Sequence, residues 1–184
     1  MRTEVDHSRL KYQNFQEDSI WVDGHLFLPW FLEHWDRYPR DQESLPAAWA
    51  MAWTHGSQNR GFNPGMEEAM MELLEGMELD EMPMQELMSE AEQQRLHSLQ
   101  YPVQVFRGVN LKQREDLDLS WPGCCWTLSQ ERAEWFARRP GNAAAVLKLQ
   151  LNHPWEIKAC FLERNEEEIV VDCRNLDPPA VSWI

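Results

Sequence analysis

Hydrophobic positions in the first half of the chain recur at intervals of three and four residues, which is typical of amphipathic helices. Residues 25–37 are dense in aromatics, and we expect a helix there that tolerates Pro29 only in its first turn. A second helix is predicted to begin near Leu45 and to stop at Gly56. Residues 1 to about 20 are polar and mixed, and we expect them to be loosely ordered.

The next stretch alternates between turn-forming and helical patterns. Residues 56–65 have the composition of a loop. A helix is predicted over 66–75, with Glu outward and with three inward side chains, those of Met70, Leu73 and Leu74. The pattern breaks around 76–83. Ser89 then begins a capping-box sequence, S-E-A-E, which predicts a short helix ending near Leu99.

From Tyr101 onward, short runs with β-branched residues alternate with turns. A helix is predicted over 130–139, with Ala133, Trp135, Phe136 and Ala137 facing inward. The predicted strands cover 101–108, 123–129, 143–151, 155–162 and 166–173, and the last two form a hairpin. A helical first half followed by a mostly β second half is an α+β layout.

The length of 184 residues fits a single domain, which we expect to span 1–184 with a helical part (1–99) and a β-rich part (100–184). Hydrophobic residues make up 43% of the chain, enough for a substantial core, so global disorder is excluded.

The formal net charge is −14, and it is concentrated in one region. No Lys or Arg occurs between Arg60 and Arg95, a stretch that holds ten acidic residues and seven of the nine Met. This sign argues against non-specific nucleic-acid binding and against docking on an anionic membrane. Inward Met on a solvated acidic helix is the simpler interpretation of the stretch, and a docking face for a basic partner is the other.

Two further features bear on the compartment and on metals. The four cysteines show no CxxC spacing and no neighbouring His pair, so we expect no zinc site. The first ten residues lack the apolar segment of a signal peptide, and no apolar run approaches the length of a membrane span. We therefore expect a cytoplasmic protein with reduced thiols.

Three pieces of the second half carry candidate chemistry. The first is an Arg at a predicted strand end, in Val105-Phe106-Arg107-Gly108. The second is the strand Cys125-Trp126-Thr127-Leu128-Ser129, which leads into a helix with the sequence A-E-W-F-A at 133–137. The third is Glu166-Glu167-Glu168 before the apolar run Ile169-Val170-Val171.

In this order the three pieces resemble the R-S-E type of mono-ADP-ribosyltransferase, over roughly residues 100–174. The resemblance implies a split β-sandwich core preceded by N-terminal helices. It implies transfer of ADP-ribose from NAD+ to a protein acceptor, with an arginine as the acceptor side chain and no metal. Proteins of this general kind occur in phages and among bacterial effectors.

The resemblance also implies roles for individual residues. Glu168 would stabilise the oxocarbenium-like transition state through a ribose hydroxyl, and Glu166 would orient the acceptor guanidinium. Two carboxylates at i and i+2 of a strand share one face. The remaining motif residues would bind NAD+, with the Arg on its phosphates. They are Arg107, Gly108, Cys125, Thr127 and Phe136.

The chain departs from the family pattern at Cys125, where the family has its first Ser. A thiol is a weaker hydrogen-bond donor than a hydroxyl. Either Thr127 or Ser129 compensates, or activity is reduced.

Two alternatives remain open. The same residues would serve an NAD+ glycohydrolase, with water as acceptor. A catalytically silent binding protein on the same fold, with an acidic face for a basic partner, would explain the charge and the Cys but not an intact Arg–Glu–Glu set.

Overall fold

The computed structural model describes residues 9–13, 19–37, 44–59, 64–80, 87–119, 122–139, 143–162 and 167–184. The chain forms two compact units, residues 1–89 and 90–184. The predicted boundary between a helical and a β-rich part, at 99/100, falls after the first helix of the second unit. No helix within the described ranges is long and apolar enough to cross a membrane.

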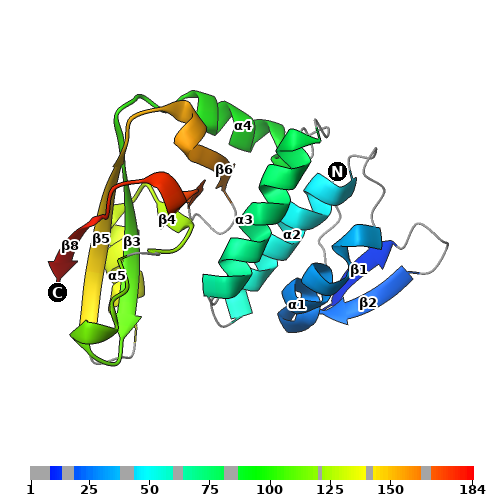
Figure 1. The fold of residues 1–184 in the computed structure, drawn as a ribbon, viewed down its shortest axis with the longest axis horizontal. Coiled ribbons are helices and arrows are strands. Elements are labelled where there is room, and N and C mark those ends of the chain that lie inside the picture. The colour runs from blue at the N-terminus through cyan, green and yellow to red at the C-terminus, as the bar shows by residue number, and fades with distance from the viewer. Residues whose placement is uncertain are drawn as a thin grey trace. The chain divides into compact units, whose positions relative to one another are not determined.

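The described residues of the first unit form a two-stranded antiparallel sheet and three α-helices (Figure 1). In chain order its elements are β1 (Arg9–Gln13), β2 (Ser19–Asp23), α1 (Gly24–His34), the 3₁₀ turn η1 (Trp35–Arg37), α2 (Ser44–Asn59) and α3 (Pro64–Leu79). The β1–β2 ladder pairs Arg9 with Asp23 and Gln13 with Ser19. The expectation that residues 1 to about 20 are loosely ordered is therefore wrong for the two strands.

Tryptophans of α2 form the centre of the first unit's core. Trp49 and Trp53 are one helical turn apart, are fully buried, and stack with ring centroids 4.9 Å apart. The indole N–H of Trp49 donates to the carbonyl oxygen of Met70 on α3 at 2.7 Å. A buried indole needs such an acceptor, so this hydrogen bond fixes α2 against α3.

Two predicted helix ends and one position in the first unit are wrong. Pro29 lies in the second turn of α1, α2 runs three residues beyond Gly56, and α3 passes through Gly76 and ends at Leu79, within the predicted break at 76–83. A helical Gly costs about 1 kcal/mol relative to Ala. Burial of Met77, which follows Gly76 and is 1% exposed, offsets a penalty of that size. The predicted loop 56–65 is helical at both ends, and 60–63 lie outside the described residues.

Helix α3 has the inward Met and outward Glu side chains predicted for the Met-rich acidic stretch, except at Glu67, which is buried. Its Met70, Met71 and Met77 are buried, together with the predicted inward residues Leu73 and Leu74. The exposed side chains of the same helix include three carboxylates, those of Glu68, Glu72 and Glu78. The acidic surface and the core are thus two faces of one amphipathic helix.

The second unit is built on a six-stranded antiparallel sheet with the order β6-β7-β4-β3-β5-β8 (Figure 1). Its strands are β3 (Val103–Leu111), β4 (Cys125–Thr127), β5 (Ala143–Leu151), β6 (Ile157–Phe161), β7 (Glu168–Val171) and β8 (Ala180–Trp183). Its helices are α4 (Glu90–His97) and α5 (Gln130–Ala137), and 3₁₀ turns lie at η3 (Arg114–Asp116), η4 (Pro154–Glu156) and η6 (Cys173–Asn175). The α+β class is confirmed, as is the helix that begins after Ser89.

Helix α5 covers one face of the sheet over β3 and β5. Its buried Ala133 and Ala137 pack on Val146, with Phe106 beside them. The approach is close, because a Cβ built at Gly108 would lie 1.9 Å from the carbonyl oxygen of Ala133. Only glycine permits this spacing between helix and strand.

The predicted inward direction of Trp135 is wrong. Ala133 and Ala137 are one turn apart and define the buried stripe of α5, whereas Trp135 lies between them in sequence, on the other side of the helix, and is 52% exposed. The strand predicted over 101–108 extends to Leu111, so Arg107 sits in mid-strand and not at a strand end.

Candidate functional site

The strands that carry the three motifs lie side by side at the centre of the sheet. Arg107 is on β3, Cys125 and Thr127 are on β4, and Glu168 opens β7. Strand β4 lies between the other two, pairing Phe106 with Thr127 on one edge and Thr127 with Glu168 on the other. The topology therefore brings together motifs that are about 20 and 40 residues apart in sequence.

Thr127 and Glu168 are direct cross-strand partners. Directly opposed residues of an antiparallel pair project from the same face of the sheet, so the Thr hydroxyl and the Glu carboxylate share a side. Thr127 is 7% exposed, one of two buried polar side chains in the described part of the chain, and Glu168 is half-buried. Cys125, two residues before Thr127, faces the same way.

The turn from β4 into α5 is fixed by two side-chain hydroxyls. Oγ1 of Thr127 accepts from the backbone N–H of Ser129 at 3.2 Å, and Oγ of Ser129 accepts from the backbone N–H of Arg132 at 3.2 Å. Ser129 thereby caps the N-terminus of α5, an end that carries partial positive charge. The Thr127 hydroxyl thus connects β4 to Ser129, the residue that caps α5.

Arg107 holds the turn that precedes β4. Its Nη1 donates to the carbonyl oxygen of Cys125 at 2.9 Å. Gly123 has φ +83°, and a Cβ there would lie 2.5 Å from the guanidinium carbon of Arg107. The carbonyl oxygen of the same glycine accepts from the Trp126 indole at 2.8 Å and from the Cys173 thiol at 3.3 Å. Gly123 therefore provides both the left-handed backbone and the space that the guanidinium fills.

Strand alternation separates Arg107 from the Thr127–Glu168 pair. Phe106 is the partner of Thr127 and packs toward α5, so the next residue, Arg107, leaves β3 on the opposite face, alongside the buried Leu147. The structure thus brings the three motif strands together and divides their side chains between two faces of the sheet.

Two of the remaining predicted residues, Gly108 and Phe136, take part in packing. Gly108 makes room for α5. Phe136 is half-buried on α5, in an edge-to-face contact with Trp135 at 5.1 Å and with the Arg139 guanidinium 4.3 Å from its ring centre. Cys125 is half-buried, whereas the other three cysteines are buried. Glu166 lies outside the described residues, so its predicted role stays a prediction.

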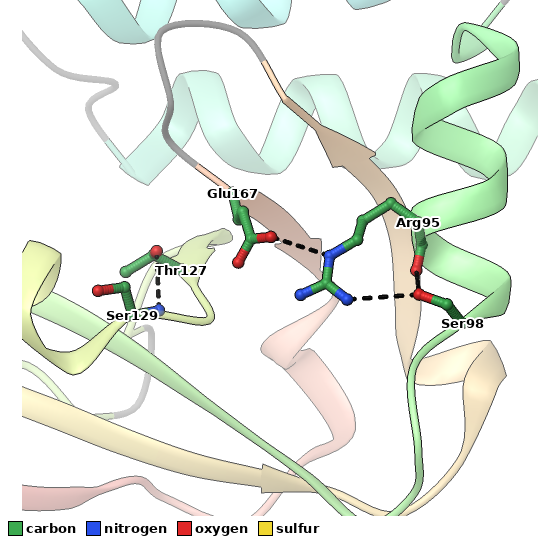
Figure 2. A network of polar contacts seen from close by, with 5 residues as sticks. All are labelled: Arg95, Ser98, Thr127, Ser129 and Glu167. Carbon is green, nitrogen blue, oxygen red and sulfur yellow. Dashed lines mark hydrogen bonds and ion pairs between the residues drawn. The ribbon is translucent and has the colours of Figure 1, made fainter.

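Sequence reasoning missed an ion pair beside Glu168. Nε of Arg95, on α4, donates to Oε1 of Glu167 at 2.9 Å, and its Nη1 donates to the Ser98 hydroxyl at 3.3 Å. Figure 2 shows the Glu167 carboxylate pointing toward Arg95, with Thr127 and Ser129 at the end of the neighbouring strand. The indication of this ion pair in the sequence is that Arg95 is the first basic residue after the long acidic stretch.

Glu92, also on α4, makes a second contact between this helix and the sheet. The backbone N–H of Leu162, at the end of β6, donates to Glu92 Oε1 at 3.0 Å, which ties α4 to the sheet. The pKa of the Cys160 thiol is raised to about 11, chiefly by burial, with Arg95 lowering it and Glu92, Glu167 and Glu168 raising it. Arg95 and these carboxylates therefore all act on the Cys160 thiol.

Comparison of the chain with known protein families, curated proteins and solved structures gave no match. Among the described residues, no group of three or more His, Cys, Asp or Glu side chains is arranged to hold a metal ion.

Proposed function

We propose that the protein is a mono-ADP-ribosyltransferase that transfers ADP-ribose from NAD+ to a protein arginine, and that the second unit has the ADP-ribosyltransferase split β-sandwich fold. The observation that carries the proposal is the direct pairing of Thr127 with Glu168 at the centre of the sheet. It brings the second and third motifs together on one face, as the R-S-E resemblance requires.

The chemistry calls for a fixed negative charge beside the ribose. Nicotinamide leaves NAD+ as a neutral molecule, so the reaction needs stabilisation of a cationic transition state and no general acid. A half-buried carboxylate at the start of β7 meets that need, because partial exclusion of water strengthens its interaction with developing positive charge. Glu168 would hold a ribose hydroxyl, and Thr127 with Cys125 would line the same face.

In the proposed enzyme, Arg107 acts by supporting strand β4. Its bond to the Cys125 carbonyl and its place over Gly123 fit a positioning residue for β4. The phosphate contact predicted from the sequence would require the diphosphate to reach the opposite face of the sheet. These two roles differ in the kinetic constant that they control.

In the proposed function, the acidic surface of α3 would attract the acceptor protein. A protein that presents an arginine to this enzyme carries at least local positive charge, and the exposed carboxylates on α3 would attract it. Modification of a protein acceptor would then weaken as salt rises.

The experiment is NAD+ turnover by the purified protein, with agmatine as a small guanidine acceptor. We expect wild type to release nicotinamide and to form ADP-ribosyl-agmatine. Glu168→Gln keeps the shape of the side chain and removes its charge, so turnover should fall about 100-fold or more. The matched control is Glu131→Gln, the same change at an exposed position in the first turn of α5.

The outcomes separate the three candidate functions. Release of free ADP-ribose without labelled agmatine or protein would mean a glycohydrolase. No turnover and no NAD+ binding by calorimetry would reject both enzymes and leave the acidic binding protein. Equal activity of Glu168→Gln and wild type would show that the site is assigned to the wrong carboxylate.

A further inference from the structure

The first unit contains a groove that shares no residue with the proposed catalytic site. Its volume is about 490 Å³, and three helical segments line it. Leu32 of α1 and Trp35 of η1 line one part, Leu45 at the start of α2 lines another, and a stripe from Ala69 of α3 to Asp80 lines the rest. This volume lies within the range of ligand-binding pockets, about 300–1,000 Å³.

Buried and exposed side chains divide the groove into a floor and a rim. Leu45, Leu73 and Met77 are buried and apolar, so they form the floor. Leu79 lines the same groove and is nevertheless 84% exposed. A Cβ built at Gly76 meets nothing within 4 Å, so there is open space beside this residue. The floor and the exposed leucine together form an apolar surface of the kind that binds a partner.

Two carboxylates give the rim a negative charge. Glu72 and Asp80 line the groove, are exposed, and are eight residues apart. The backbone N–H of Asp80 donates to the carbonyl oxygen of Gly76 at 3.0 Å, so helical spacing extends to this residue. At 1.5 Å per residue, about 12 Å separates the two carboxylate positions along the helix axis. Among the described residues that line the groove, none is basic.

We propose that this groove is a docking site for an amphipathic helix of a partner protein, with apolar side chains on one face and two lysines or arginines about two turns apart. The apolar side chains would cover the floor beside Gly76, and the two cations would pair with Glu72 and Asp80. Two turns of a helix laid along α3 span about 11 Å, which matches the spacing of the carboxylates. The inference concerns binding alone and does not depend on NAD+ chemistry.

Charge favours a basic partner over a second copy of the chain. Each copy has a net charge of −14, so two copies repel each other, whereas a basic segment is attracted. Helix α3, which forms much of the groove, lies in the stretch without Lys or Arg between Arg60 and Arg95. Binding of a basic helix should therefore weaken as salt rises.

The experiment selects helix-forming peptides from a phage-displayed library on the full-length protein and discards those that also bind the Gly76→Leu variant. Leucine at this position extends into the open space of the groove and replaces a helical glycine, so the fold should be retained. The matched control is Gly76→Ala, which adds a single methyl group at the same place. Thermal melting verifies that both variants fold.

The Kd of each selected peptide is then measured by fluorescence anisotropy. We expect Kd to rise about tenfold or more for Gly76→Leu and by less than about twofold for Gly76→Ala.

The carboxylates are tested with the same peptides. Glu72→Gln combined with Asp80→Asn should raise Kd about fivefold or more. The matched control combines Glu68→Gln with Glu78→Gln, which removes as many charges from exposed positions of α3 that do not line the groove. This control should change Kd by less than about twofold.

The selected peptides should share apolar residues and a pair of Lys or Arg about two turns apart. Failure to enrich any sequence on wild type over Gly76→Leu would overturn the inference, as would enrichment of sequences that lack the pair of cations. Sedimentation of wild type as a dimer and of Gly76→Leu as a monomer would assign the groove to a second copy instead. None of these measurements involves NAD+ turnover, so the inference and the proposed function can fail separately.

Discussion

Thr127 of β4 and Glu168 of β7 are direct cross-strand partners, and the Thr127 hydroxyl also accepts the backbone N–H of Ser129 at the start of α5. One residue therefore connects the strand that carries the proposed catalytic carboxylate with the helix that covers the sheet. A change at Thr127 should affect both folding and activity, and two substitutions separate these effects.

Thr127→Val keeps the shape of the side chain and removes the hydroxyl. The Ser129 N–H then loses its acceptor, and we expect the free energy of unfolding to fall by about 1 kcal/mol. Thr127→Ser restores the acceptor and should recover most of the NAD+ turnover that the valine variant loses. Denaturant unfolding and nicotinamide release measure the two effects. Equal loss of turnover in both variants would mean that the methyl group, and not the hydroxyl, is required.

Gly108→Ala tests the contact between α5 and β3. The new methyl group would meet the carbonyl oxygen of Ala133 at 1.9 Å and the backbone nitrogen of Ala137 at 2.7 Å, both of which are main-chain atoms that cannot rotate away. We expect destabilisation of about 3 kcal/mol or more, or failure to fold. The measurement is the midpoint of urea unfolding.

The control for this substitution is Gly76→Ala in α3. A Cβ at Gly76 meets nothing within 4 Å, and the residue lies inside a helix. The same chemical change should therefore stabilise the protein, by up to about 1 kcal/mol. Opposite signs for the two glycines would confirm the packing argument, and similar small effects would contradict it.

Arg107→Lys tests the two roles open to this arginine. Lysine keeps the charge but cannot fill the space over Gly123 with a planar guanidinium. We expect a lower Tm and a lower kcat, with the KM for NAD+ nearly unchanged, because the bond to the Cys125 carbonyl is weakened. A raised KM for NAD+ at an unchanged Tm would instead support the phosphate contact.

Asp172 and Arg174 provide a test of pH dependence away from the site. Oδ1 and Oδ2 of Asp172 accept from Nε and Nη2 of Arg174, each at 2.8 Å, and these bonds hold the pKa of Asp172 below its usual value. A depressed carboxyl pKa stabilises the fold above the unfolded pKa of about 4, and this contribution is lost as the pH falls through the folded pKa.

Asp172→Asn should therefore lower the free energy of unfolding by about 1–3 kcal/mol at pH 7 and by much less near pH 3. Asp177→Asn, the same change at an exposed residue nearby, is the control and should have little effect at either pH. Urea unfolding at the two pH values measures both. A pH-independent effect of Asp172→Asn would show that its charge is not the cause.

Cys160 is expected to be the least reactive kind of thiol. Its side chain is buried on β6, and burial raises its pKa to about 11, so almost no thiolate forms at pH 8. Alkylation of the native protein by iodoacetamide, followed by peptide mass spectrometry, should modify the half-buried Cys125 well before Cys160. Comparable rates for these two thiols would contradict the expectation.

The raised pKa of Cys160 also predicts how the free energy of unfolding changes at alkaline pH. A thiol whose pKa is raised in the folded state favours folding below its unfolded pKa, and this contribution is lost as the pH rises through the folded value. Wild type should therefore lose stability between about pH 9 and pH 11. Cys160→Ala should show a smaller decline over that interval in urea unfolding.

The class of fold and the location of most elements follow from local patterns in the sequence. The change from helical to alternating periodicity near Tyr101, the capping sequence at Ser89 and the apolar runs of the strands are local signals, and the structure has the corresponding elements. Glycine and proline were weaker guides: Gly76 and Pro29 lie within helices, because burial of their neighbours outweighs a local preference that amounts to a few kcal/mol at most.

How the predicted residues relate to one another follows from strand order and register, which local patterns do not contain. Strand order made Thr127 and Glu168 partners, whereas the alternation along β3 sent Arg107 to the other face of the sheet. Pairing across the sheet depends on register and on contacts between distant segments, which no local pattern encodes. For the same reason the sequence could not reveal that Arg95, 72 positions before Glu167, holds its carboxylate.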